Sequence, residues 1–266
     1  KANLVIPTGN SFLSKNKSRH PSKLWPIYFD KSKGCEIWDY DGKKYYDFSF
    51  MGVGTNILGY SNPKIDNQLF KILKKGNMTT LNCPEEPKFA REILKPHSWA
   101  KMAKFAKTGA EAKAIAIRLA RAYTKKNKII LCGYHGWHDW YLAAKFNRKS
   151  YMETHLFPKL KIHGVPNFLK NSVFSVKYNN FEEIKKIFKK NKDIAAIIME
   201  VKRFEEPNKN YLSLIRSFCS KNNICLIFDE CTTGFRENYG GLHLKYKVNP
   251  DLAMFGKAIG NGYSIT

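Results

Sequence analysis

The sequence contains no apolar run long enough to cross a bilayer. Its longest apolar runs, residues 194–199 and 224–228, are strand-length, whereas a membrane helix needs roughly 20 residues. Residues 1–7 hold only three consecutive apolar residues, so we expect no secretory signal there. The six cysteines form no C-x-x-C pair, and several lie in strand-like apolar runs. This pattern predicts reduced, buried thiols in a cytoplasmic protein that has no membrane partner.

Acidic residues are scarce, and so is arginine. The chain has 22 Asp and Glu against 46 Lys and Arg, for a net charge of +24. Only eight of the basic residues are arginine, and the lysines are spread along stretches such as 71–75 and 185–192. A nucleic-acid binder would concentrate its charge and mix in arginine and stacking aromatics. We therefore expect solvated helix faces and no nucleic-acid partner, with salt-dependent DNA binding as the competing hypothesis.

The composition is otherwise that of a globular protein. With 266 residues, 43% hydrophobic and 26% charged, the chain can form one large α/β domain or two small ones around a sizeable core. It starts at Lys1 and stops at Thr266, just after a glycine-rich turn. We expect it to be a fragment.

The first hundred residues mix irregular segments with short regular elements. The stretch up to about Pro21 is polar and irregular. Two aromatic runs within residues 36–48 flank Asp41-Gly42, which predicts a hairpin with both turn positions at positive φ. Pro63 opens an expected helix over 63–75, which Gly76 ends. Another helix is expected over 85–94.

From residue 100 the pattern becomes strand, turn, helix. Apolar strands alternating with helices predict a mostly parallel sheet flanked by helices, an α/β fold. Residues 145–172 are basic and lack a clean period, so we expect a long insertion. The expected strands are 102–106, 129–132, 173–176, 194–199, 224–228 and 252–255, and the expected helices are 111–123, 181–190 and 211–222.

Polar or glycine-rich residues follow successive expected strands. Because ligands bind beyond the carboxyl ends of parallel strands, these positions predict one coherent site. They are Thr108-Gly109, Tyr134-His135, Glu200, Asp229 and Lys257.

The helix start after Thr108 and the end of the strand before Glu230 each indicate ligand binding. Gly109 and Ala110 open a helix, where free N–H groups and the positive dipole end bind phosphate, although small residues also open helices for packing. Asp229 ends a buried strand and needs a cation or donors. A helix cap or a salt bridge with Arg236 is the structural alternative.

Lys257 and the histidines each have two interpretations. Lys257 follows an apolar strand and precedes glycines; it is either a Schiff-base amine or a solvated loop lysine. His135 and His138 lack an evident third ligand, so we expect no metal site. A ring stacked on a flat cofactor suits this strand end better.

Taken together, the segments resemble the class III aminotransferases, fold type I pyridoxal-phosphate enzymes that include glutamate-1-semialdehyde 2,1-aminomutase. The matching blocks occur in the family's order over nearly the whole chain. They are 38–48, 58–63, 108–112, 116–122, 133–136, 227–230, 233–236, 250–252 and 256–257.

The resemblance implies roles for the residues that bear the chemistry. Lys257 would form the Schiff base with pyridoxal 5'-phosphate and move the proton. Asp229 would pair with the pyridine nitrogen and keep it protonated, so that the ring acts as an electron sink. Gly109 and Ala110 would donate backbone N–H bonds to the phosphate.

The resemblance also assigns the residues around the cofactor ring. Tyr134 would stack on one face with His135 beside it, and Cys231 would pack on the other face. Glu200 would help to order the site. The Val201-Lys202 pair and Ser264 depart from the family pattern, as do Ala110 in place of Ser or Thr and Cys231 in place of an aliphatic residue.

The resemblance further implies parts that this chain lacks. A C-terminal small domain follows the lysine in the family, and a later threonine of the partner subunit contacts the phosphate. Family members are homodimers, so we expect a homodimer of the full-length protein. We divide the chain into an N-terminal segment with a hairpin (1–60) and an incomplete cofactor-binding large domain (61–266).

The expected function is amino transfer between a small-molecule amine or amino acid and a keto or aldehyde acceptor. The alternative is an intramolecular transfer of the aminomutase type. A second alternative is a fragment that binds cofactor without turnover. Residues 137–141 and the insertion lie where substrate access could be controlled, but they identify no substrate.

Overall fold

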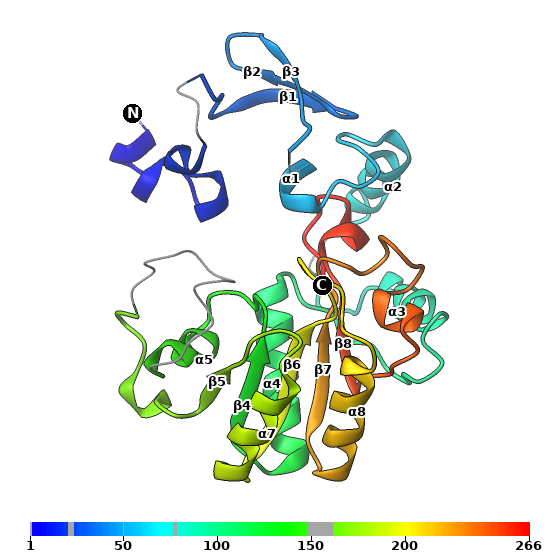
Figure 1. Cartoon of the computed structure of the whole chain (residues 1–266). Helices are drawn as coiled ribbons and strands as arrows, with labels where there is room; N and C mark the ends of the chain where they lie inside the picture. Colours follow the sequence, from blue (N-terminus) through cyan, green and yellow to red (C-terminus); the bar gives the residue numbers. More distant parts are fainter. Residues whose placement is uncertain (1, 21–23, 50, 77–78, 148–161) are drawn as a thin grey trace. The chain divides into compact units, whose positions relative to one another are not determined.

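The computed structural model describes residues 2–20, 24–49, 51–76, 79–147 and 162–266 (Figure 1). Half of the expected insertion over 145–172, residues 148–161, lies outside this part of the chain. The chain divides into two compact units, Lys1–Asn82 and Cys83–Thr266. The functional division at residues 60 and 61 stays a prediction.

The first unit contains a three-stranded antiparallel sheet in the order β1-β2-β3. The expected hairpin is present, but only Gly42 of its loop is left-handed, with φ 78°. Asp41 needs no positive φ because the Asp39 side chain accepts the N–H groups of Asp41 and Lys43, at 3.0 and 2.9 Å. The elements are β1 (Phe29–Lys33), β2 (Glu36–Asp39), β3 (Lys44–Tyr46), α1 (Met51–Gly54) and α2 (Pro63–Leu73), with 3₁₀ turns at Ala2–Leu4, Pro7–Gly9, Leu13–Lys15 and Lys17–Arg19.

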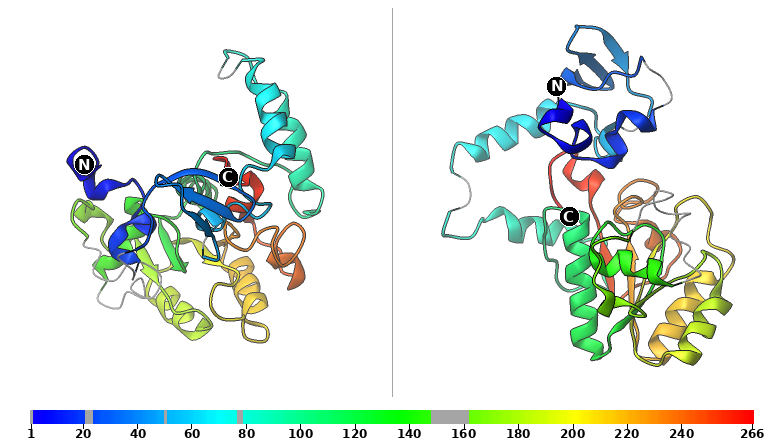
Figure 2. Two further views of the ribbon diagram at one scale, coloured as in Figure 1. Left: turned by 90° about the horizontal axis from the view of Figure 1, so that it is seen from above. Right: turned by 90° about the vertical axis from the view of Figure 1, so that its left-hand side faces the viewer.

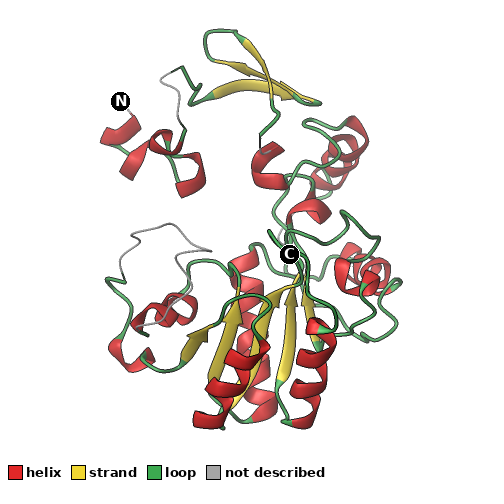
Figure 3. Ribbon diagram, in the orientation of Figure 1, coloured by secondary structure: helices red, strands yellow, loops and turns green. Residues whose placement is uncertain are grey.

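The second unit is built on a five-stranded parallel sheet in the order β5-β4-β6-β7-β8 (Figure 3). This arrangement confirms the α/β fold that the sequence predicts. The strands are β4 (Lys128–Cys132), β5 (Val173–Ser175), β6 (Ile194–Glu200), β7 (Cys225–Asp229) and β8 (Leu252–Met254). The helices are α3 (Glu85–Leu94), α4 (Gly109–Thr124), α5 (Asp139–Leu142), α7 (Phe181–Lys190), α8 (Tyr211–Lys221) and α9 (Leu242–Lys245), with 3₁₀ turns at Ala143–Phe146, Asn167–Leu169 and Lys257–Gly260.

Helices cover both faces of this sheet (Figure 2). On one face α4 packs Ile117 and Ala120 against strand residues such as Ile198. On the other face α7 and α8 pack against the alternate strand residues, among them Ile197 and Phe228. Because both faces are covered, the central strands are apolar throughout, and ligands can reach the sheet at its carboxyl edge.

One expected strand is wrong. Residues 102–106 form no strand. Ala106 instead exchanges two backbone hydrogen bonds with Thr266, at 2.9 and 2.8 Å. Such a reciprocal pair is one rung of an antiparallel ladder, and a single rung does not make a strand.

Candidate active site

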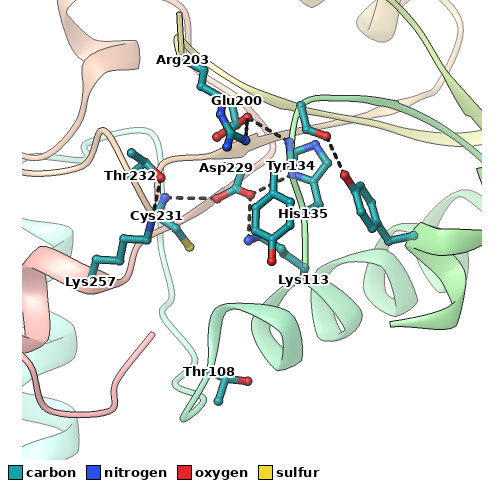
Figure 4. Close-up of polar contacts among 12 residues, drawn as sticks. Thr108, Lys113, Tyr134, His135, Glu200, Arg203, Asp229, Cys231, Thr232 and Lys257 are labelled. Carbon is teal, nitrogen blue, oxygen red and sulfur yellow. Dashed lines mark hydrogen bonds and ion pairs between the residues drawn. The ribbon is translucent and has the colours of Figure 1, made fainter. Parts of the chain in front are cut away.

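The candidate site lies at the carboxyl edge of the parallel sheet (Figure 4). Glu200 and Asp229 are the last residues of β6 and β7, and they are paired in the strand register. His135 follows β4 and Lys257 follows β8. Adjacent strands therefore bring together side chains that are up to 122 residues apart in the sequence.

Asp229 is almost fully buried, and the chain supplies three donors to its carboxylate. Oδ1 accepts the backbone N–H of Cys231 at 3.1 Å. Oδ2 accepts Lys113 Nζ at 2.9 Å and His135 Nδ1 at 2.8 Å. Burial by itself would raise the pKa of Asp229, but the charge of Lys113 and the hydrogen bond from His135 outweigh it and hold the pKa well below its usual range. Asp229 is therefore a fixed negative charge in a dry environment.

His135 connects this carboxylate to the end of β4. Its second ring nitrogen, Nε2, lies 3.1 Å from the carbonyl oxygen of Cys132. The side chain is buried, so these two contacts fix the orientation of the ring. His135 thus holds the Asp229 carboxylate in place. Among the described residues, no group of three or more His, Cys, Asp and Glu could hold a metal ion.

Lys257 presents a primary amine to the same group of residues. It begins a 3₁₀ turn in the left-handed conformation, with φ 48°, and its Nζ donates to Thr232 Oγ1 at 3.0 Å. Burial lowers the pKa of Lys257. Partial desolvation of this kind increases the fraction of neutral, nucleophilic amine.

The N-terminus of α4 lies at the candidate site, next to Cys231. Thr108 caps the helix, and Glu111 completes a capping box with it. The first helical bond runs from Ala112 N to Thr108 O at 3.1 Å. The N–H groups of Gly109 and Ala110 precede this bond and lie at the open, positive end of a 16-residue helix, where anions bind.

Two glycines keep the space around Cys231 open. A Cβ on Gly109 would lie 3.4 Å from Cys231 Sγ, and one on Gly256 would lie 3.3 Å from the same atom. Cys231 itself is buried, and its burial raises the pKa of the thiol. The thiol is therefore an apolar packing surface, and it lies between Asp229 and Lys257 in Figure 4.

Tyr134 is held in place by a carboxylate on its backbone. Glu200 Oε2 accepts Tyr134 N at 2.9 Å and Arg203 Nη1 at 3.2 Å. The Arg203 guanidinium also lies over the Tyr134 ring, 5.5 Å from its centroid. Gly133 is required here, because its φ is 109° and a Cβ would lie 2.4 Å from Glu200 Oε2.

The structure thus places every predicted site residue in one unit and at one edge of the sheet. Sequence reasoning missed Lys113, Thr232 and Arg203. Lys113 carried a signal: it lies three and four residues before Ala116 and Ile117, on the buried stripe of α4, where a lysine needs a partner.

Two predictions about other side chains need correction. All six cysteines are free, as expected, but Cys35 and Cys83 are exposed. Under the structural alternative, Arg236 was the cation expected in a salt bridge with Asp229, but the cation that pairs with this carboxylate is Lys113. No helix in the described part of the chain is long and apolar enough to cross a membrane.

Known proteins are similar to this chain in sequence. The aminotransferase class-III family matches residues 17–266. The 3-aminobutyryl-CoA aminotransferase of Cloacimonas acidaminovorans is 33% identical over 100% of this chain, and the glutamate-1-semialdehyde 2,1-aminomutase of Nitrosopumilus maritimus is 36% identical over the same share. This chain spans 61% of the length of each of these relatives.

Solved structures agree on the fold. An omega-transaminase from Sphaerobacter thermophilus superposes with a TM-score of 0.85 at 24% identity, over 99% of this chain and 60% of that one. The FumI protein of Sphingopyxis sp. MTA144, solved in its PLP internal aldimine form, gives 0.83 at 26% identity, over 99% and 61%.

The parallel sheet, with a lysine and an aspartate at its carboxyl edge, has the fold of the pyridoxal-phosphate-dependent transaminases. The chain belongs to the class III aminotransferase family. The family expected from the sequence is confirmed, and pyridoxal 5'-phosphate is its cofactor.

Proposed function

We propose that this chain is the cofactor-binding part of a pyridoxal-phosphate aminotransferase, which moves an amino group between a small amine or amino acid and a keto or aldehyde acceptor. The observation that carries the proposal is the pair at the sheet edge. A partly desolvated amine, Lys257, and an ionised buried carboxylate, Asp229, lie in one cluster around Cys231. The chain therefore has the two groups that this chemistry needs at opposite ends of a pyridine ring.

The donor set fits the cofactor. The N–H groups of Gly109 and Ala110 suit its phosphate, Asp229 suits its ring nitrogen, and Lys257 suits its aldehyde. Tyr134 and Cys231 offer an aromatic and an apolar surface for its flat ring. When bound, the cofactor supplies an electron sink for the carbon that loses a proton.

The chain's own groups do the remaining work. Lys257 holds and moves the proton through Nζ, and Thr232 Oγ1, 3.0 Å away, orients that atom. Glu200 fixes the backbone of Tyr134. The buried positions of Asp229 and Cys231 exclude water from the ring's surroundings.

An aminomutase is the second candidate. Several relatives, 33–37% identical to this chain, are named glutamate-1-semialdehyde 2,1-aminomutase. An intramolecular transfer needs no separate acceptor, whereas a transaminase does. Product formation from an amino aldehyde with and without added keto acid separates the two reactions. A passive cofactor binder would give no product in either assay.

The decisive experiment uses the full-length protein with pyridoxal phosphate. Borohydride reduction followed by peptide mapping should place the cofactor's mass on Lys257. Lys257→Ala should lose the visible absorbance of lysine-bound cofactor and reduce turnover by about 10²–10⁴-fold or more, because the proton-transferring group is gone. The exposed Lys221→Ala is the matched control. A cofactor attached to another lysine would refute the assignment.

The homodimer and the cytoplasmic location belong to the same proposal. Sedimentation of the full-length protein tests the dimer, and a monomer with full activity would contradict it.

A further inference from the structure

One buried cation at this site has no role in the proposed function. Lys113 lies in the second turn of α4 and is only 5% exposed. It occupies the stripe that packs Ala116, Ile117 and Ala120 against the sheet. A buried ammonium requires an anion, and Lys113 has one in Asp229, 2.9 Å away.

Lys113 lies beside Asp229, which suits the cofactor's ring nitrogen, and beside Gly109, whose N–H group suits its phosphate. Its Nζ is at Asp229 Oδ2, and it would be 3.6 Å from a Cβ on Gly109, the first residue of the phosphate-binding helix end. Figure 4 shows its side chain rising from α4 toward Asp229, beside Tyr134. The ammonium is therefore part of the cofactor's surroundings, not of a remote salt bridge.

Asp229 has little hydrogen-bonding capacity left. An ionised carboxylate offers about four lone-pair sites. Cys231 N takes one, and Lys113 and His135 take two more. Any further donor must share the carboxylate with a full positive charge.

The ammonium keeps its proton. Burial by itself would lower the pKa of Lys113, but the charge of Asp229 outweighs it and raises the pKa above the ordinary value. Glu200 acts in the same direction as Asp229. A second cation on Asp229 would lie close to this ammonium in a dry site, where like charges repel strongly.

We propose that Lys113 shares Asp229 with the cofactor's ring nitrogen and keeps that nitrogen mainly unprotonated. This rests on the proposed function. Asp229 alone would stabilise a pyridinium. With Lys113 on the same carboxylate, the neutral pyridine is favoured, and it can accept a hydrogen bond from the ammonium. The ring is then a weaker electron sink than the aspartate alone would make it.

The test measures the protonation of the ring nitrogen directly. The full-length protein is reconstituted with pyridoxal phosphate carrying ¹⁵N in its ring, and the ¹⁵N chemical shift is recorded. We expect a pyridine-like shift in the wild type. Lys113→Met should move the signal by the full difference between pyridine and pyridinium, because Asp229 then has no other ammonium.

Two variants separate charge from structure. Lys113→Arg restores a cation and should return the wild-type shift. Arg118→Met removes an exposed cation from the same helix and should leave the shift unchanged. If Lys113→Met does not fold, Lys113→Gln tests the same loss of charge.

The outcomes are distinct. A pyridinium signal in the wild type, or equal signals in wild type and Lys113→Met, overturns the role of Lys113 while leaving the proposed function intact. A wild type that forms no lysine-bound cofactor overturns the proposed function, and this inference falls with it.

Discussion

Asp229 and Glu230 are consecutive buried carboxylates at the end of β7, and they point to opposite sides of the sheet. Glu230 has no exposed surface and accepts four donors: the backbone N–H groups of Leu242 and His243, the His243 ring and the Thr233 hydroxyl. Asp229 accepts three, one of them an ammonium. A carboxylate saturated by its own chain is structural. One with capacity left, next to a second amine, can take a ligand.

The surroundings of the two residues differ in the same way. Next to Glu230, Trp99 Nε1 donates to His243 Nε2 at 3.2 Å. The His97 ring stacks on the His243 ring, with the two ring centroids 5.4 Å apart. Gly241 leaves no room, because a Cβ there would lie 3.0 Å from Glu230 Oε1. Around Asp229, besides Lys113 and His135, the side chains include the Cys231 thiol, the Tyr134 ring and Lys257. The side chains around Glu230 therefore form a filled polar core, whereas those around Asp229 include groups that can bind a ligand or transfer a proton.

Removing Glu230 should have the largest effect on stability. Glu230→Ala leaves two backbone N–H groups and a hydroxyl buried without their acceptor, so we expect a loss of about 3–5 kcal/mol in the free energy of unfolding. Urea denaturation monitored by fluorescence measures it. Glu237→Ala, at an exposed carboxylate, is the control and should be nearly neutral. If Glu230→Ala leaves the free energy of unfolding nearly unchanged, Glu230 does not have the structural role that distinguishes it from Asp229.

Asp229→Asn should have a smaller effect, and one that depends on pH. The folded-state pKa of Asp229 is depressed, so its charge stabilises the fold above the ordinary Asp pKa of 3.8, and this contribution is lost as the pH falls below that value. We expect Asp229→Asn to lose roughly 2–3 kcal/mol at pH 7, since hydrogen bonds to a charged group are lost.

The pH series provides the check. The difference between wild type and Asp229→Asn should narrow as the pH falls below 3.8. Glu182→Gln, at an exposed carboxylate of α7, should change little at any pH. A gap between wild type and Asp229→Asn that stays constant down to pH 3 would show that the charge of Asp229 does not stabilise the fold.

Helices α3 and α7 were predictable because their local sequence and their packing agree. The bounds of α3 and α7 match the expectation at both ends, since each helix has acidic residues in its first turn and an amphipathic pattern. The expected strand over 102–106 failed because strand pairing is non-local. Only Ala106 finds a partner, and that partner is 160 residues away in the sequence.

The site was predictable to the extent that strand ends reveal it. Asp229, Glu200 and Lys257 each follow an apolar run, and parallel strands bring such positions together. Lys113 was missed because a lysine in a helix of a lysine-rich chain is normally on the solvated face. Its spacing to Ala116 and Ile117 was a signal, and the packing of α4 against the sheet shows that it lies on the buried stripe.

The smallest effect concerns the helix that carries Lys113 to Asp229. Thr108→Ala removes the side chain that accepts Glu111 N at 3.3 Å and caps α4, so we expect a loss of about 1 kcal/mol in the free energy of unfolding. Thr108→Ser should retain most of the stability, and Ser213→Ala, at an exposed position within α8, should cost nothing.

Because the same helix end carries the N–H groups of Gly109 and Ala110, Thr108→Ala should also weaken pyridoxal-phosphate binding in a fluorescence titration of the full-length protein. Glu230→Ala perturbs the opposite side of the sheet, so in the variant that remains folded it should change stability more than cofactor affinity. If Thr108→Ala lowers stability but leaves cofactor affinity unchanged, the start of α4 is a structural cap and does not belong to the Asp229 side of the comparison.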